Sequence, residues 1–502
     1  MFDLVSNLWL GFGVALTPSN LLFALSGCLM GTLIGVLPGI GPLAAVALLL
    51  PITFHLAPVA SLIMLAGIYY GAQYGGSTTS ILVNMPGEAS SIVTCIDGYQ
   101  MARNGRAGAA LAIAALGSFF AGTVATFLIA MVAVPLASIG QAFGSAEYFS
   151  LMLLGLVGSV VLAHGSVIKA IAMIVFGLLV GLIGTDLYTG APRFTFGIPE
   201  LFDGIGFVPI ALGLFGLAEI ISNLASNNVE PRAVVSKKIT RLLPTRDEFN
   251  RAWPASIRGT AIGSMLGVLP GGGPMLASFT SYMVEKKIAK DPSRFGQGAV
   301  EGVSGPESAN NAAAQTSFIP MLTLGIPSTP LMALMIGAMM IQGITPGPQV
   351  MTQKPDLFWG LIASMWIGNA MLLIINLPLI GMWVAMLRVP YRLLFPAILL
   401  FCAIGVYSVN NSTFEVLMAA LFGVLGYFFR KMECEPAPMM LGLVLGPLME
   451  LHLRRALLLS YGDPMVFLQR PISLGLLIAA AVMLVIVALP HIRKGREAVF
   501  RE

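Results

Sequence analysis

A twelve-residue motif occurs twice in this chain of 502 residues, and each copy interrupts an apolar stretch. The copies, at residues 31–42 and 263–274, are identical at eight positions and begin 232 residues apart. Matches of Leu or Val arise easily in an apolar chain, but a matched Pro followed by Gly-x-Gly-Pro does not. Proline removes a backbone donor and glycine lets the chain turn, so each copy predicts a broken helix. Two halves with broken helices are typical of a membrane transporter whose site lies at a repeat interface.

The composition places the chain in a membrane. Hydrophobic residues make up 57% and charged residues 10%, whereas soluble domains carry about 25% charged residues. Apolar runs near the ~20 residues that cross a bilayer predict an all-α polytopic membrane protein with about 12 transmembrane segments. We expect them near residues 17–37, 42–73 (a bent segment or hairpin), 107–137, 146–163, 166–184, 205–224, 257–283, 318–343, 357–386, 393–409, 412–429 and 471–490.

The placement of positive charge predicts the organisation and orientation of the chain. The net charge is only +4, but seven basic residues crowd the polar stretch 225–258. In a soluble protein such a run is a nucleic-acid candidate, whereas in a membrane protein it marks a cytoplasmic segment. We therefore predict a first transmembrane repeat at 1–224, a basic cytoplasmic linker at 225–258, and a second repeat with an extra C-terminal helix at 259–502. No nucleic-acid partner is expected.

Equivalent loops of the two halves differ in charge. The loop at 101–106 carries Arg103 and Arg106 and is predicted to face the cytoplasm, whereas the loop at 345–356 has one Lys and one Asp and is predicted to be external. This difference indicates two inverted-topology repeats with broken helices or re-entrant hairpins. Arg454, Arg455 and Arg470 do not fit the scheme, because they lie on its external side.

A second pair of polar stretches follows the two motif copies, at 74–88 and 304–329. Exposed N–H groups of half-helices attract carboxylates, while freed carbonyls and hydroxyl or amide oxygens hold Na⁺. Helix kinks and polar contacts between helices are the structural alternative. We predict substrate binding by Gly39, Gly41, Gly75, Gly76, Ser77, Thr78, Gly271, Gly273, Asn310, Asn311, Ser328 and Thr329, and cation binding by Asn84, Pro86, Glu307, Ser308 and Gly325.

Charged side chains near these stretches are acidic. Glu88, Asp97, Glu301 and Glu307 are candidates, with Glu307 foremost because it lies inside a run of small polar residues. Neither 31–100 nor 295–353 contains Lys or Arg, so we expect an anionic solute to be held without an arginine clamp. Four scattered cysteines and four scattered histidines indicate neither a disulfide framework nor a metal site. P-loop, nucleophile-elbow and zinc-protease motifs are missing, so we expect no enzyme and no cofactor besides Na⁺ or H⁺ as coupling ion.

Several motifs in order resemble one family. They are residues 35–42 (GVLPGIGP), 70–77 (YGAQYGGS), 84–88 (NMPGE), 97–99 (DGY), 269–274 (LPGGGP), 307–314 (ESANNAAA), 322–327 (LTLGIP) and 343–348 (GITPGP). The chain is similar to the large membrane subunit of the tripartite tricarboxylate transporters, the TctA family. The resemblance implies a bacterial inner-membrane transporter of citrate or other carboxylates that works with a small four-helix membrane subunit and a periplasmic solute-binding protein. Residues 326–330 and 315–317 depart from the family pattern and leave the particular carboxylate open.

The leading hypothesis is therefore a cation-driven carboxylate importer, surrounded by membrane lipid. A dianion entering a cell at ~100 mV works against roughly 4.6 kcal/mol, so at least two cations must accompany it to neutralise that cost. A passive pore or exporter, or a membrane-embedded scaffold or enzyme, are the alternatives.

Overall fold

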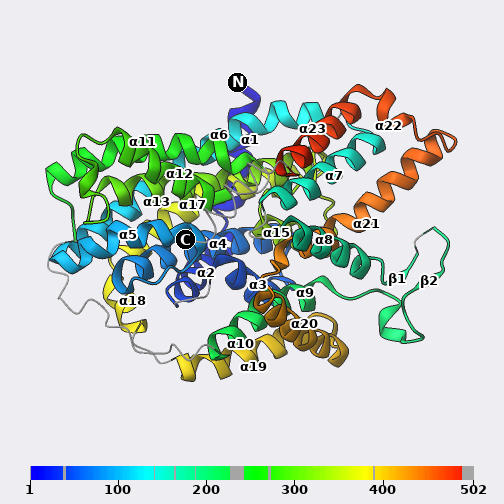
Figure 1. Cartoon of the computed structure of the whole chain (residues 1–502), viewed down its shortest axis with the longest axis horizontal. Coiled ribbons are helices and arrows are strands. Elements are labelled where there is room, and N and C mark those ends of the chain that lie inside the picture. Colours follow the sequence, from blue (N-terminus) through cyan, green and yellow to red (C-terminus); the bar gives the residue numbers. More distant parts are fainter. Residues whose placement is uncertain are drawn as a thin grey trace.

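The fold is described by a computed structural model covering residues 2–37, 41–140, 142–162, 166–186, 188–225, 242–269, 273–387 and 391–488. These residues are almost entirely helical, with a single two-stranded antiparallel ribbon among them (Figure 1). Within the described ranges, six helices are long and apolar enough to cross a membrane, and seven apolar helices of 10–17 residues accompany them. The prediction of an all-α polytopic membrane protein is confirmed.

The elements divide at the basic stretch into two sets. The first set is α1 (Phe2–Ala15), α2 (Pro18–Gly35), α3 (Pro42–Thr53), α4 (Pro58–Val83), η1 (Ala89–Ser91), α5 (Ile92–Met101), the π-helical turn η2 (Ala102–Arg106), α6 (Ala107–Gly140), α7 (Ser145–Leu162), α8 (Val167–Gly181), β1 (Gly184–Thr185), β2 (Pro192–Arg193), η3 (Pro199–Leu201), α9 (Phe207–Ala211), the π-helical turn η4 (Leu212–Leu217) and α10 (Ala218–Ala225). The second set is α11 (Arg246–Val268), α12 (Gly273–Ile288), η5 (Pro292–Arg294), α13 (Glu301–Thr316), α14 (Phe318–Leu324), α15 (Pro330–Ile341), α16 (Gln349–Gln353), α17 (Pro355–Asn376), α18 (Ile380–Met386), α19 (Tyr391–Asn410), α20 (Thr413–Lys431), α21 (Pro436–Leu459), α22 (Val466–Gln469) and α23 (Pro471–Ala488).

The sequence repeat is also a repeat of packing. α2 lies against α4, and α11 lies against α13, through glycines spaced four residues apart. A Cβ atom built on any of these glycines would lie 2.2–2.3 Å from a carbonyl oxygen of the opposing helix, so only glycine permits the approach. Gly27, Gly31 and Gly35 face the carbonyls of Met64, Ile68 and Ala72, and Gly259, Gly263 and Gly267 face those of Gly305, Ala309 and Ala313.

Each half then has a helix break of the same kind, after α4 in the first half and after α14, the helix that follows α13, in the second. α4 ends at Asn84 and α14 ends at Gly325, both in the left-handed conformation with φ of 58° and 73°. Asn and Gly are the residues that tolerate this conformation best, and a proline follows two positions later in both halves. The predicted segment 318–343 is therefore two helices, α14 and α15, rather than one.

Three further predicted segments also contain two helices. Residues 42–73 include α3 and the first part of α4, residues 257–283 include parts of α11 and α12, and residues 357–386 include α17 and α18. Sequence analysis missed α21, because Glu450, Arg454 and Arg455 lower the hydropathy of its second half. Of the predicted linker, 226–241 lies outside the described residues, and α11 already begins at Arg246 with a reciprocal cap between Thr245 and Glu248.

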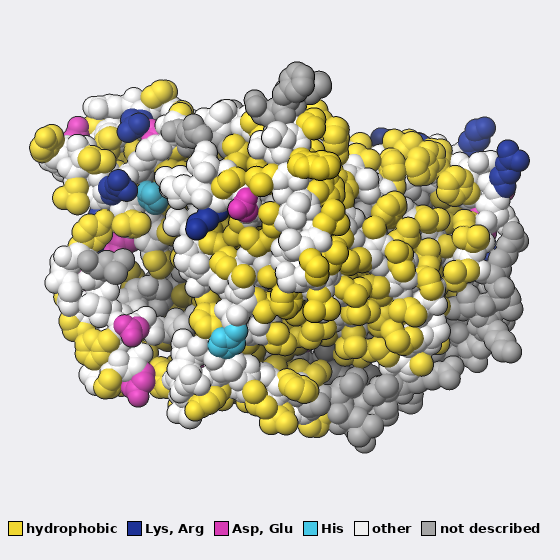
Figure 2. All heavy atoms as spheres, turned by 180° about the vertical axis from the view of Figure 1, so that it is seen from behind, with side chains coloured by type: hydrophobic (Ala, Val, Ile, Leu, Met, Phe, Trp, Pro, Cys, Tyr) yellow, Lys and Arg dark blue, Asp and Glu magenta, His cyan; other side chains and the backbone are white. Residues whose placement is uncertain are grey.

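The long helices define an axis of the molecule. α11, α12, α13 and α17 lie along the horizontal of Figure 1, with the β1–β2 ribbon projecting at one end and α5 at the other. Seen from behind, apolar side chains cover much of the middle, while most charged side chains gather towards the two ends (Figure 2). This distribution matches a bilayer crossed along that axis. That the end with Arg103 and Arg106 faces the cytoplasm stays a prediction.

Candidate functional site

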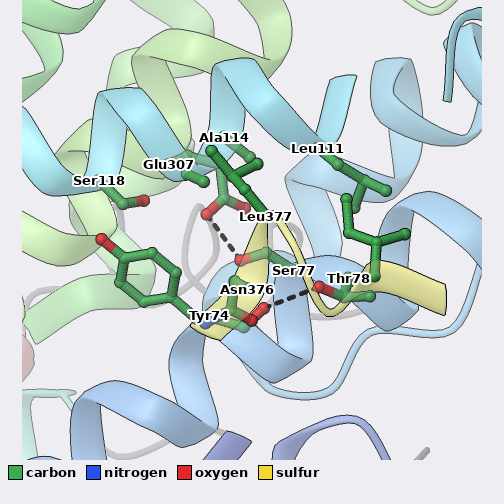
Figure 3. Close-up of a pocket in the computed structure, with 11 residues that line it drawn as sticks. Tyr74, Ser77, Thr78, Leu111, Ala114, Ser118, Glu307, Asn376 and Leu377 are labelled. Carbon is green, nitrogen blue, oxygen red and sulfur yellow. Dashed lines mark hydrogen bonds between the residues drawn. The ribbon is translucent and has the colours of Figure 1, made fainter. Parts of the chain in front are cut away.

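The two halves meet at a buried carboxylate. Glu307 on α13 is 1% exposed and accepts a 2.7 Å hydrogen bond from the Ser77 hydroxyl on α4 (Figure 3). The Thr94 hydroxyl on α5 donates to the other carboxylate oxygen. No Lys or Arg of the described chain pairs with Glu307, and the two hydroxyls leave its charge uncompensated. A buried charge of this kind is costly unless a proton or cation joins it.

A small cavity opens beside this carboxylate. It is lined from α4, α6 and α13 and by the region around the end of α17, with Tyr74, Ser77, Thr78, Leu111, Ala114, Ala115, Ser118, Glu307, Asn376, Leu377 and Ile380 (Figure 3). Its volume of about 20 Å³ has room for roughly one water molecule or a bare cation, but not for a carboxylate solute.

In each half, the helix that starts at the motif copy packs against the helix break of that half. In the first half, a Cβ on Gly41, at the start of α3, would lie 3.3 Å from the Gly87 carbonyl and 3.7 Å from Glu88 Cβ. In the second half, a Cβ on Gly273, at the start of α12, would lie 3.2 Å from Thr329 Cγ2. Asn310 links the halves, since its amide donates to Glu88 Oε1 at 3.0 Å. Both motif copies are thus anchored near the same interface.

Several buried polar atoms around the interface have no partner. Both amide atoms of Gln73 are unpaired although its side chain is fully buried, and Gln73 and Ser317 lie next to the Tyr69 hydroxyl. The unpaired atoms nearby in sequence include Tyr70 Oη, Ser308 Oγ, Asn310 Oδ1 and Gln315 Oε1. A buried donor or acceptor without a partner costs about 1–3 kcal/mol, so this concentration marks a region suited to a polar guest.

Comparison with known proteins decides the family. Residues 21–441 match the Tripartite tricarboxylate transporter TctA family. The chain belongs to this family. It is 61% identical over 502 residues, the whole of both chains, to an uncharacterized 52.8 kDa protein in the TAR-I ttuC' 3' region of Agrobacterium vitis. It is also 61% identical over 240 residues, 48% of this chain and 99% of the relative, to an uncharacterized protein in the TAR-II ttuC' 3' region of the same organism. No solved structure matches it. The chain is therefore a subunit of a tripartite tricarboxylate transporter.

The structure of this TctA member brings some of the predicted substrate residues together. Ser77 and Thr78 line the cavity, and Asn311 lies behind it, donating to Ser118 Oγ at 2.7 Å. Ser328 donates to the Ser317 carbonyl, and Thr329 caps α15. Gly39 and Gly271 lie outside the described residues.

The predicted glycines of α4 serve packing. A Cβ on Gly75 would lie 2.6 Å from the Thr32 carbonyl of α2, so Gly75 is closed to a ligand. Gly76 faces Gly87, and a Cβ atom added to Gly87 would clash with Gly76 Cα. Gly75 therefore holds α4 against α2, and Gly76 holds α4 against the break; neither lines the cavity.

The predicted cation residues separate. Glu307 lies at the interface, and Ser308 next to it is buried with an unpaired hydroxyl that faces Gly117 of α6. Asn84 and Pro86 are exposed and do not line the cavity, while Gly325 packs against the 346–347 backbone.

The other candidate acids have structural partners. Asp97 accepts hydrogen bonds of 2.8–2.9 Å from the backbone N–H groups of Gly296, Gly298 and Ala299, and a fourth from the Tyr282 hydroxyl. Glu301 forms a two-armed ion pair with Arg251. Asp97 connects α5 to the loop before α13 and to α12, and Glu301 connects α13 to α11.

Sequence reasoning missed residues that contact or surround Glu307. Thr94 donates to it, Tyr74 lines the cavity and donates to Asn369 Oδ1 at 3.0 Å, and Asn376 lines the same cavity. The sequence did contain a signal for Asn369 and Asn376, because they lie seven residues apart and hence on one side of the apolar helix α17. Gln73 lies within a family motif, but its lack of a partner is visible only in the fold.

Proposed function

We propose that this chain is the large membrane subunit of a secondary symporter that imports a tricarboxylate or another carboxylate across the bacterial inner membrane. It acts without enzymatic chemistry, beside a small four-helix membrane subunit, and receives solute from a periplasmic binding protein. Na⁺ or H⁺ drives uptake. Family membership supports the tripartite assembly, and the arrangement around Glu307 supports cation coupling.

The observation that carries the coupling is the position of Glu307. Its charge lies at the contact between two halves that must move relative to each other in alternating access. Binding of H⁺ or Na⁺ would remove the cost of the buried charge and change the contact with Ser77 and Thr94. The ion would therefore stabilise one arrangement of the halves.

The solute would bind beside this carboxylate when the cavity widens. The spans 31–100 and 295–353 contain no Lys or Arg, so N–H groups of the half-helices and Ser, Thr and Asn side chains must hold the anion. An anion held without fixed positive charge depends on the co-bound cation for affinity. Such coupling typically amounts to about 1–3 kcal/mol, or 5–150-fold in affinity.

Glu307→Gln tests the coupling. Gln keeps the size of the side chain but carries no charge; its carbonyl oxygen can accept from one of the two hydroxyls, and its amide NH2 can donate to the other after that hydroxyl rotates. In proteoliposomes that contain the chain with its two partners, solute counterflow should persist in the variant. Its half-saturating solute concentration should no longer respond to Na⁺ or pH, while the wild-type value changes about 5–150-fold.

A variant on the same helix serves as the control. Glu301→Gln removes a carboxylate that pairs with Arg251, so stability should fall while the cation dependence remains. An unchanged cation response in Glu307→Gln would reject the proposed role of this residue.

Uptake that never exceeds the external concentration would instead indicate a passive pore. Chemical conversion of the solute would indicate an enzyme.

A further inference from the structure

An apolar groove lies between α6 and α11, away from the Glu307 cavity. Its volume is about 300 Å³, and its walls include Ile113, Leu116, Phe119 and Phe120 on α6. Phe249 and Trp253 of α11 complete it: the Trp253 ring lies 4.5 Å from that of Phe120 and stacks 6.0 Å from that of Phe249. Both α11 aromatics remain more than 40% exposed.

The polar atoms at the floor of the groove are already paired. The Ser256 and Ser304 hydroxyls lie 2.6 Å apart, and the Ser304 hydroxyl also donates to the Ala252 carbonyl at 2.8 Å. The Thr123 hydroxyl bonds to the Phe119 carbonyl at 2.7 Å. With no unsatisfied polar group, the groove suits a hydrocarbon chain.

Unpaired positive charge lies at one end of the groove. The Arg106 to Glu248 ion pair of 2.8 Å joins the turn before α6 to the start of α11. Arg103 precedes this pair along the chain and Arg246 begins α11; both side chains are exposed and neither has an ion-pair partner among the described residues. Arg246 lies seven residues before Trp253 on the same helix, about 10 Å along its axis.

We propose that this groove is a binding site for an anionic phospholipid. One acyl chain lies along Phe120, Phe249 and Trp253, and the phosphate group lies near Arg103 and Arg246. Basic residues at the cytoplasmic end of a groove between membrane helices are the usual means of recognising an anionic headgroup. The lipid would thereby join α6, which supports the first half, to α11 of the second half.

Lipid titration of the delipidated, purified chain tests the headgroup contact. Phosphatidylglycerol should raise the thermal unfolding midpoint at lower concentration than phosphatidylcholine. Each arginine contributes about 1 kcal/mol near an anionic lipid, so Arg103→Gln with Arg246→Gln should weaken phosphatidylglycerol binding about 30-fold. Arg455→Gln is the matched control, because this exposed arginine lies on α21 and should leave the preference unchanged.

Equal effects of the two lipids on wild type, or a preference that survives in the double variant, would overturn the proposal. An equal effect of inorganic phosphate would assign the arginines to a free anion and also overturn it.

Fluorescence quenching tests the acyl-chain contact. At saturating lipid, phosphatidylglycerol brominated in its acyl chains should quench wild-type fluorescence by a larger fraction than that of Trp253→Phe. Equal quenching of the two would place the chain elsewhere. Loss of the lipid effect when the small membrane subunit binds would assign the groove to that subunit instead.

Discussion

Two buried carboxylates, Asp97 and Glu307, are bound in opposite ways. Asp97 receives three backbone N–H groups and a tyrosine hydroxyl, and its donors lie on a loop closed by Gly296 and Gly298 at positive φ. Glu307 accepts hydrogen bonds from two side-chain hydroxyls, those of Ser77 and Thr94, and from no backbone N–H group in the described structure. Backbone donors are fixed by the fold, whereas hydroxyls can rotate. Asp97 is therefore suited to structure and Glu307 to a changing partner.

Asp97→Asn should destabilise the chain. The variant loses charge-assisted hydrogen bonds, which are worth about 1.5–3 kcal/mol. Its NH2 group would also face N–H or O–H groups that are themselves donors. We expect a loss of that size in the free energy of unfolding, measured by denaturation in detergent. Asp291→Asn, at an exposed carboxylate bonded within its own loop to Ser293, is the control and should differ little from wild type. Equal stability of Asp97→Asn and wild type would contradict this role.

Gln73→Leu should separate affinity from stability. The buried amide of Gln73 has no internal partner, so an apolar side chain of similar size removes its desolvation cost. The thermal midpoint should stay equal or rise, while the solute concentration for half-maximal counterflow increases about tenfold or more. A lower midpoint with unchanged affinity would mean that Gln73 has a structural partner. Asn376→Leu offers a comparison at the cavity beside Glu307, which Gln73 does not line; there the amide nitrogen already donates to the Leu372 carbonyl.

At the level of helices, the repeat consists of two similar packed pairs, α2 with α4 and α11 with α13. Their glycine ladders bring backbones together so closely that an added methyl group meets a carbonyl oxygen. In a bilayer, where lipid is as apolar as the protein surface, such packing replaces the hydrophobic effect as the force that joins helices. The broken helices therefore start from two rigid supports.

Gly31→Ala and Gly263→Ala should each disturb this support. The new Cβ would lie 2.2 Å from the Ile68 or Ala309 carbonyl oxygen, and overpacking of this kind typically costs about 1–3 kcal/mol. We expect a lower yield of folded protein and a lower thermal midpoint. Gly13→Ala on α1 meets nothing within 4 Å and should be neutral or slightly stabilising. Identical behaviour of all three variants would argue against close packing.

At the scale of the whole molecule, the loops at 101–106 and 345–356 have different surroundings. Arg106 pairs with Glu248 and reaches the Gly298 carbonyl at 3.4 Å. The backbone at Gly347 instead approaches Tyr148, whose ring stacks on His452 of α21. That the repeats are inverted stays a prediction, which rests on the charge difference between these two loops.

Cysteine labelling in intact membranes measures this topology directly. Asn104 and Gln349 are both exposed, so a cysteine at either position can react with a reagent that does not cross the membrane. We expect the two sites to be labelled from opposite sides, with Asn104 on the cytoplasmic side. The native Cys95 and Cys434, which are partly exposed, should be replaced by Ser beforehand. Labelling from one side would reject the inversion.

The sequence by itself determined the membrane class, the duplication and the positions of the helix breaks. These properties depend on neighbours along the chain: an apolar run crosses a bilayer wherever it packs, and Pro or Gly interrupts a helix without help from other elements. The positions of acidic and basic residues could likewise be read directly, which is how Glu307 stood out among the acids. All of α21 was missed, because the charges of its second half obscured the same local signal.

Only the tertiary structure decided which of the polar residues meet. Ser77 and Glu307 are 230 residues apart, and helix packing brings their side chains to 2.7 Å. The same packing turned Gly75 into a helix contact, left Asn84 exposed and enclosed Gln73 without a partner. Whether a polar residue is paired, exposed or orphaned depends on which helix faces it. No local pattern contains that information, because the facing residue belongs to a distant part of the chain.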